Sequence, residues 1–119
     1  MSNIKVTIES HLPEATEALE KALALWAEMT GGEMVNLTHR DRANRGTPVD
    51  TGRLRNSMTF AKSEDNKTVY IGSNVEYARP VEEGRQGKGG AHMLRNAVVD
   101  VKDTAAKYLE NALKSQDIV

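Results

Sequence analysis

The residues of this chain best suited to chemistry are three histidines and a pair of adjacent glutamates. His11, His39 and His92 lie far apart in the sequence, and none has the spacing of a metal-binding motif. The chain has no cysteine, which excludes a thiol nucleophile and thiolate metal ligands. Glu82 and Glu83 are neighbours, and adjacent residues of one element point in different directions, which does not suit shared acid–base catalysis. We therefore expect no enzyme activity, no bound metal and no cofactor.

The segment from Gly84 to Gly90 contains four glycines and one lysine, a composition that invites comparison with phosphate-binding loops. The comparison fails, because Glu82 stands where the first glycine of that motif would be and Gly89 stands where Ser or Thr would follow the lysine. The composition instead predicts a flexible loop that becomes ordered against a neighbouring molecule. Arg85 and Lys88 are then candidate contacts with a partner.

Positive charge is densest in the segment 40–55, which carries five arginines: Arg40, Arg42, Arg45, Arg53 and Arg55. One use would be binding of DNA phosphates without sequence preference, with the first three arginines facing the DNA. The other use is pairing with acidic residues of the same or a neighbouring subunit. The net charge of the chain is −1, which argues against bulk affinity for nucleic acid and favours pairing.

Charges also alternate in blocks along the chain. Acidic residues predominate in 1–33, with six acidic and two basic residues, and in 58–83, with five acidic and three basic residues. Basic residues predominate in 34–57, with five basic and two acidic residues, and in 84–119, with six basic and four acidic residues. Such blocks would set the register between copies of one protein. An ordinary scatter of solvated surface charges explains them equally well.

The alternation of Ile4, Val6 and Ile8 with polar residues predicts a strand over 3–9, followed by a long N-terminal helix. Within that helix Leu23 and Leu25 fall off the main apolar stripe, which favours contact with a partner. Two successive glycines, Gly31-Gly32, predict a kink or break. Helical spacing then resumes over 33–44 and ends at Arg45-Gly46.

The connector 47–57 combines turn, cap and helix-start residues. Asp50 or Thr51 would cap a short helix over 52–56, and Arg53 would pair with Asp50 three residues before it. Its local role is that of a capped connector, with Asp50, Arg53 and Arg55 as candidates for a partner surface.

Two short runs, 57–61 and 68–71, have the composition of strands and flank a polar turn, which predicts an antiparallel pair. Apolar residues at helical spacing predict a long helix over 92–115. The expected fold class is α+β, in which a three- or four-stranded antiparallel sheet carries the N-terminal and C-terminal helices. At this length we expect 1–119 to form a single domain.

The absence of cysteine is compatible with a reducing cytoplasm. The N-terminal residues lack the apolar core of a signal peptide, and the longest apolar run, 22–27, is too short to cross a membrane. We therefore expect a protein that is made in the cytoplasm and has no membrane partner.

Three segments carry a resemblance to a known family: Val49-Asp50-Thr51-Gly52-Arg53-Leu54-Arg55-Asn56-Ser57, Val75-Glu76-Tyr77-Ala78-Arg79-Pro80-Val81-Glu82-Glu83-Gly84, and His92-Met93-Leu94-Arg95-Asn96-Ala97. In this order they resemble the VDTGRLRxS, VxYAxxVExG and xLRxA elements of the head–tail connector and tail-component family of long-tailed bacteriophages. The resemblance implies a structural virion protein that completes the tail or joins it to the head.

The same resemblance implies a homo-oligomeric ring at the neck or upper tail end, partnered by other head-connector or tail proteins. Leu23, Leu25, Asp50, Arg53, Arg55, Arg85 and Lys88 are the candidate interface residues in that ring. The alternative is a small DNA-binding or regulatory module that uses the basic segment 40–55. No second helix flanking a recognition helix is evident in the sequence, which disfavours that alternative.

Overall fold

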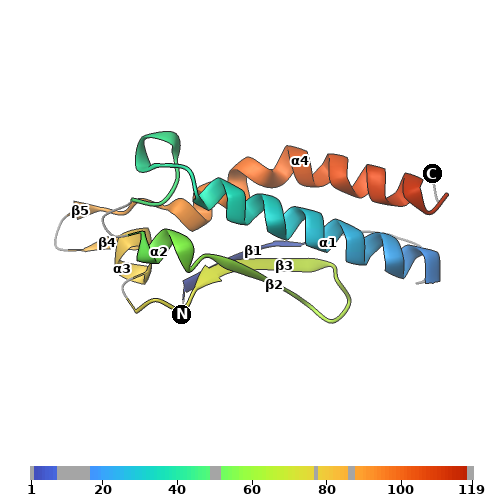
Figure 1. The fold of residues 1–119 in the computed structure, drawn as a ribbon, viewed down its shortest axis with the longest axis horizontal. Helices are drawn as coiled ribbons and strands as arrows, with labels where there is room; N and C mark the ends of the chain where they lie inside the picture. Colours follow the sequence, from blue (N-terminus) through green and yellow to red (C-terminus); the bar gives the residue numbers. More distant parts are fainter. Residues whose placement is uncertain (1, 8–16, 49–51, 77, 86–87, 118–119) are drawn as a thin grey trace.

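The computed structural model describes residues 2–7, 17–48, 52–76, 78–85 and 88–117. In chain order the elements are β1 (Ser2–Thr7), α1 (Glu17–Thr38), a 3-10 turn (Arg42–Asn44), α2 (Arg53–Asn56), β2 (Thr59–Lys62), β3 (Thr68–Ser73), α3 (Ala78–Glu83), β4 (Gly84–Arg85), β5 (Lys88–Gly89) and α4 (Met93–Ser115). The two long helices lie side by side in one layer over a three-stranded sheet (Figure 1). The α+β fold expected from the sequence is confirmed.

The sheet has β3 in the centre and β1 and β2 at its edges, and both pairs are antiparallel. Val6 lies opposite Val69, and Phe60 lies opposite Ile71. Because side chains alternate between the faces of a sheet, these residues share the face that meets the helices. Val69 and Ile71 are completely buried there, as expected for the central strand.

Helix α1 passes through Gly31 and Gly32 without interruption, so the break predicted there is wrong. The two glycines have different surroundings. A Cβ at Gly31 would lie 2.1 Å from the ring of Phe60, whereas a Cβ at Gly32 would meet nothing within 4 Å. Gly31 therefore lets α1 approach β2 closely, and the packing gained outweighs the intrinsic cost of a glycine in a helix.

The helix expected over 33–44 ends at Thr38, and the chain then closes a compact turn. The backbone N–H of Thr47 donates to the carbonyl oxygens of Thr38 and Arg40, and that of Gly46 donates to Asp41. A Cβ at Gly46 would lie 1.8 Å from the Arg40 carbonyl oxygen, so glycine is required at this crossing. These backbone bonds replace the helical ones, which is why the helix stops early.

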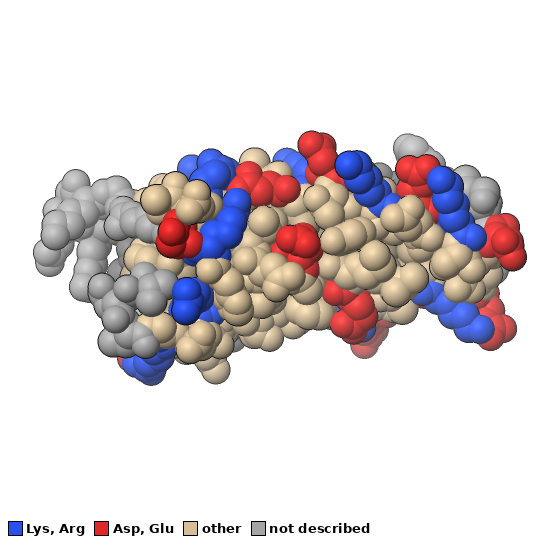
Figure 2. Space-filling model, turned by 45° about the horizontal axis from the view of Figure 1, so that its top comes forward, with Lys and Arg blue, Asp and Glu red and all other residues tan. Residues whose placement is uncertain are grey.

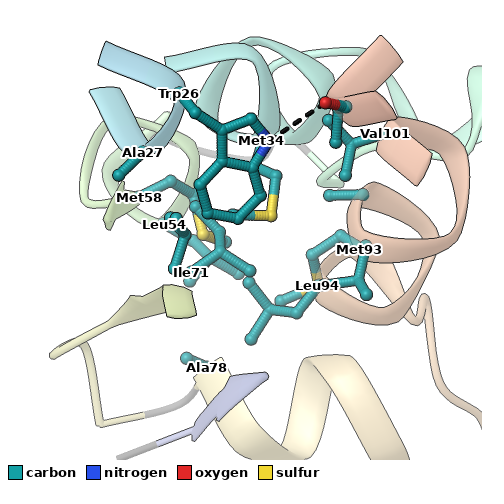
Figure 3. Packing of buried hydrophobic residues seen from close by; sticks show 14 of the residues in the cluster. Trp26, Ala27, Met34, Leu54, Met58, Ile71, Ala78, Met93, Leu94 and Val101 are labelled. Atoms are coloured by element: carbon teal, nitrogen blue, oxygen red, sulfur yellow. Dashed lines mark hydrogen bonds between the residues drawn. The ribbon is translucent and has the colours of Figure 1, made fainter. Parts of the chain in front are cut away.

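The core is centred on Trp26, which is 2% exposed and whose Nε1 donates to the Ala105 carbonyl oxygen at 3.0 Å (Figure 3). This bond ties α1 to α4 inside an aliphatic cluster. Leu23, which falls off the main apolar stripe in the sequence, is also only 2% exposed. Its side is buried because α1 is covered both by the sheet and by α4. Leu25, on the outward side, is 41% exposed.

The glycine-rich segment is not a plain loop. Gly84 pairs with Gly89 and Arg85 with Lys88, which makes β4 and β5 a short antiparallel hairpin. This differs from the expected flexible loop, because the backbone groups find partners within the segment itself.

Candidate functional site at the motif-bearing end of the domain

The three sequence motifs converge at one end of the molecule. They contribute α2, the segment from the end of β3 through α3, and the start of α4, which gather at the end opposite the C-terminus (Figure 1). We call this region, made of the described residues of 52–57, 73–84 and 90–97, the motif end.

Arg53 of the first motif reaches Glu76 of the second. Its Nη1 and Nη2 donate to Oε1 and Oε2 at 3.2 and 3.1 Å, which is a bidentate pair. The pKa of Glu76 lies below its ordinary value, mainly because its own backbone N–H and then Arg53 donate to the carboxylate. The expected partner of Arg53, Asp50, lies outside the described residues. The structure thus adds a link between the first and second motifs through two residues 23 positions apart, which local spacing does not reveal.

Ser57, the last residue of the first motif, holds α2 against the end of β3. Its Oγ lies 2.6 Å from the Leu54 carbonyl oxygen and 2.5 Å from the Ser73 Oγ. The Ser73 hydroxyl, which is buried, also accepts the backbone N–H of Val75 at 3.1 Å. This hydrogen-bonded group satisfies buried polar atoms where the sheet gives way to α3.

Glu82 joins the second motif to the third. Its side chain is buried, and its Oε1 and Oε2 accept the backbone N–H groups of Leu94 and Arg95 at 2.7 and 3.2 Å. These are among the N–H groups that have no partner within α4, and a carboxylate placed there also complements the helix dipole. Glu82 is therefore the cap of a 23-residue helix, supplied from a distant part of the chain.

The backbone around Glu82 reinforces this cap. Its carbonyl oxygen accepts the N–H of His92 at 3.0 Å, and the Val81 carbonyl oxygen accepts that of Ala91 at 2.8 Å. A Cβ at Gly90 would lie 2.1 Å from the Glu82 carbonyl oxygen, so no larger residue fits beside it. Glu83, in contrast, is exposed and pairs with Arg79 at 3.0 Å. The two adjacent glutamates thus face different surroundings, as predicted.

The basic segment is largely paired within the subunit. Arg40 donates to Asp100 Oδ2 at 2.9 Å, and Arg45 donates to Oδ2 and Oδ1 at 2.7 and 3.0 Å. The pKa of Asp100 lies below its ordinary value, mainly because Arg45 donates to the carboxylate and to a smaller extent because Arg40 does. Partial burial of the carboxylate acts in the opposite direction. Two of the three arginines considered for DNA therefore have an acidic partner on α4.

The remaining candidates are placed as follows. Arg55 is half-buried on α2. Arg85 and Lys88 lie opposite each other in the β4–β5 hairpin, but their side chains, like that of Arg42, lie outside the described residues. Arg53 and Arg55 belong to α2 at the motif end, whereas Leu25 is exposed on α1 and Leu23 is buried beneath that helix.

Other kinds of site find little support in the described part of the chain. It holds no cluster of three or more residues of the types that bind metal ions. None of its helices is both long enough and apolar enough to cross a membrane.

The comparison with protein families gives a match over residues 5–84, to the model described as "Bacteriophage HK97-gp10, putative tail-component". The match begins within β1, includes α1, β2, β3 and the first two motifs, and ends at the first residue of β4. Comparisons with curated proteins and with solved structures gave no significant match. Because the match covers well over half of the chain, this protein belongs to the HK97-gp10-like family of bacteriophage tail components.

Proposed function

We propose that this protein is a structural subunit that assembles as a ring at the head–tail junction or upper tail end, where it completes the tail or joins it to the head. The observation that carries this proposal is that the residues of the family motifs hold one end of the domain together. Arg53 binds Glu76, Ser57 binds Ser73, and Glu82 caps α4. Such residues build a stable contact surface rather than a site for chemistry.

The motif end is the surface that we assign to other phage proteins. It includes the half-buried Arg55 of α2, and the hairpin that carries Arg85 and Lys88 connects its segments 73–84 and 90–97. A preformed end lowers the entropy lost on binding, because few groups need to be ordered at the contact. Its partners are head-connector or tail proteins of the same particle, the location is the virion, and synthesis takes place in the cytoplasm of the bacterial host.

DNA binding is the weaker alternative, because Arg40 and Arg45 are both bound to Asp100, whose carboxylate neutralises one of their two positive charges. We expect the assembled protein to bind DNA undetectably or without dependence on salt. A steep loss of affinity with rising salt would instead indicate several phosphate contacts and would favour a DNA-binding role.

Deletion of the gene, followed by electron microscopy of the lysate, tests the proposal. We expect DNA-filled heads and separate tails, with joined particles restored by the wild-type gene supplied in trans. Normal numbers of joined, infectious particles in the deletion lysate would refute it.

A further inference from the structure

Arginine and lysine are segregated in this molecule. All eight arginines lie in the ranges 40–55 and 79–95, which contain one of the eight lysines, Lys88. The described parts of these ranges are the turn after α1, α2, α3, the β4–β5 hairpin and the start of α4, which gather at the end of the molecule opposite the C-terminus (Figure 1). The Asn96 Nδ2 ties the start of α4 to the turn by donating to the Arg45 carbonyl oxygen at 3.3 Å. We call the described residues of 40–55 and 79–95 the arginine end.

Lysine serves the rest of the surface. The other seven lysines lie on β1, on α1, around the β2–β3 turn and on the part of α4 that follows Asp100. Arginine and lysine each carry one positive charge, so a need for surface charge alone does not explain why they are separated. The guanidinium differs from the ammonium in its planar fork, which binds a carboxylate or a phosphate through two parallel hydrogen bonds.

Pairs within the subunit account for only part of the arginine end. Four of its arginines bind carboxylates of the same subunit, and two of these four, Arg40 and Arg45, share the single carboxylate of Asp100. Arg55 of α2 is half-buried and Arg95 of α4 is exposed, and neither has an acidic partner among the described residues. In that part of the chain, the arginine end thus has more guanidinium groups than carboxylates that they bind.

Carboxylates of the subunit lie among these arginines. The side chains of Glu76 and Glu83 are 73% and 57% exposed, and Asp41 is exposed in the turn after α1. On the face shown in Figure 2, acidic and basic side chains lie next to one another instead of forming separate fields of one sign. A DNA backbone would bring its phosphates against these carboxylates, and like charges at close range repel. A protein surface can instead place acidic residues opposite the arginines and a cation opposite each exposed carboxylate.

We propose that the arginine end binds a carboxylate-rich surface of another protein, with Arg55 and Arg95 as its bidentate contacts. Arginine is enriched and lysine is depleted at protein–protein interfaces, and the guanidinium is more weakly hydrated than the ammonium, so its desolvation costs less. Glu82 fixes the start of α4 beneath one of these contacts, because it accepts the backbone N–H of Arg95 at 3.2 Å. The inference rests on the proposed function, which places a partner protein at this end, and it adds the chemistry of that partner.

Fluorescence anisotropy with two labelled probes, a polyglutamate peptide and a DNA duplex, tests this chemistry. The test variant combines Arg55→Lys with Arg95→Lys, which keeps both positive charges and removes the planar forks. The matched control combines Lys102→Ala with Lys107→Ala, which removes two positive charges from exposed sites further along α4. We expect the test variant to bind the peptide about tenfold more weakly than the wild-type protein, and the control to bind it within a factor of about two of the wild-type protein.

Three results of this assay would overturn the inference. The first is that the wild-type protein does not bind the peptide, and the second is an equal loss of affinity in the test variant and the control. The third is tighter binding of the duplex than of the peptide, which would assign the arginines to phosphates.

Addition of purified protein to a lysate of the deletion mutant separates this inference from the proposed function. The wild-type protein and the control should restore joined particles, whereas the test variant should restore about tenfold fewer. If the test variant restores as many as the wild-type protein, the inference fails and the proposed function stands. If the wild-type protein restores none, the proposed function fails, and peptide binding alone decides whether this end recognises carboxylates.

Discussion

Replacement of Glu82 by alanine should destabilise the protein more than any other change of a single charged residue at the motif end. The side chain is 7% exposed and accepts two backbone N–H groups, from Leu94 and Arg95. A buried N–H left without an acceptor costs ~1–3 kcal/mol, and loss of a helix cap costs ~1 kcal/mol. The two contributions add to ~2–4 kcal/mol. Because Arg95 is exposed and water can reach its N–H, we take the lower part of that sum and expect the free energy of unfolding to decrease by ~2–3 kcal/mol.

Glu83→Ala is the matched control. Glu83 is the adjacent residue of the same type, but it is 57% exposed and pairs with Arg79 one helical turn away. Such a pair contributes ~0.3–0.5 kcal/mol. Glu82→Gln should lie between the two alanine variants, because it keeps one acceptor oxygen and loses the charge that complements the helix dipole.

The assay is urea unfolding followed by the fluorescence of Trp26, the single tryptophan, which is almost completely buried in the folded state. In thermal unfolding the loss for Glu82→Ala corresponds to a decrease of Tm of ~10–20 °C, since 1 kcal/mol shifts the Tm of a domain of this size by ~4–8 °C. Hydrogen exchange should accelerate first at Leu94 and Arg95. If Glu82→Ala lowered the free energy of unfolding by less than about 0.5 kcal/mol, or if Glu83→Ala lowered it by the same amount, the role assigned to Glu82 would be refuted.

The remaining predictions concern α1 and the ion pairs that follow it. Gly31→Ala should destabilise by ~1–3 kcal/mol because its Cβ would overlap the Phe60 ring, whereas Gly32→Ala should stabilise by up to ~1 kcal/mol, both measured by urea unfolding. Asp100→Asn should destabilise at neutral pH by ~1 kcal/mol, since Arg45 would lose an ionised partner. Because the pKa of Asp100 is lowered in the folded state, its ionised carboxylate stabilises the fold at pH values above the ordinary pKa of ~4, and this stabilisation is lost as the pH falls through the lower folded-state pKa. The free energies of unfolding of the wild-type protein and of Asp100→Asn should therefore converge in acid.

Much of the fold could be predicted from the sequence because its signals are local. The period-two alternation around Val6 and the polar turn between β2 and β3 identified the strands, and apolar spacing identified α4 from Met93. The prediction of a helix break at Gly31 was wrong because the cause that keeps the helix intact is not local. Intrinsic propensity cannot include the ring of Phe60, which lies against that glycine from another strand.

The candidate site shows the same division between local and distant information. The sequence indicated which segments matter, but the partners of Arg53 and Glu82 lie 23 and 12 positions away, and such pairings depend on the tertiary fold. Nor does the sequence tell which of two adjacent glutamates is buried. The arginines that bind Asp100 were expected to pair with acidic residues, and the partner itself became visible only when α4 was placed beside the end of α1.

Cryo-electron microscopy of purified phage particles that contain this chain tests the central proposal most directly. We predict a ring of identical subunits at the neck or upper tail end, each fitted by the helical layer and three-stranded sheet described above. A neck and upper tail without density for this fold, or purified particles that lack the chain, would contradict a structural role at the head–tail junction.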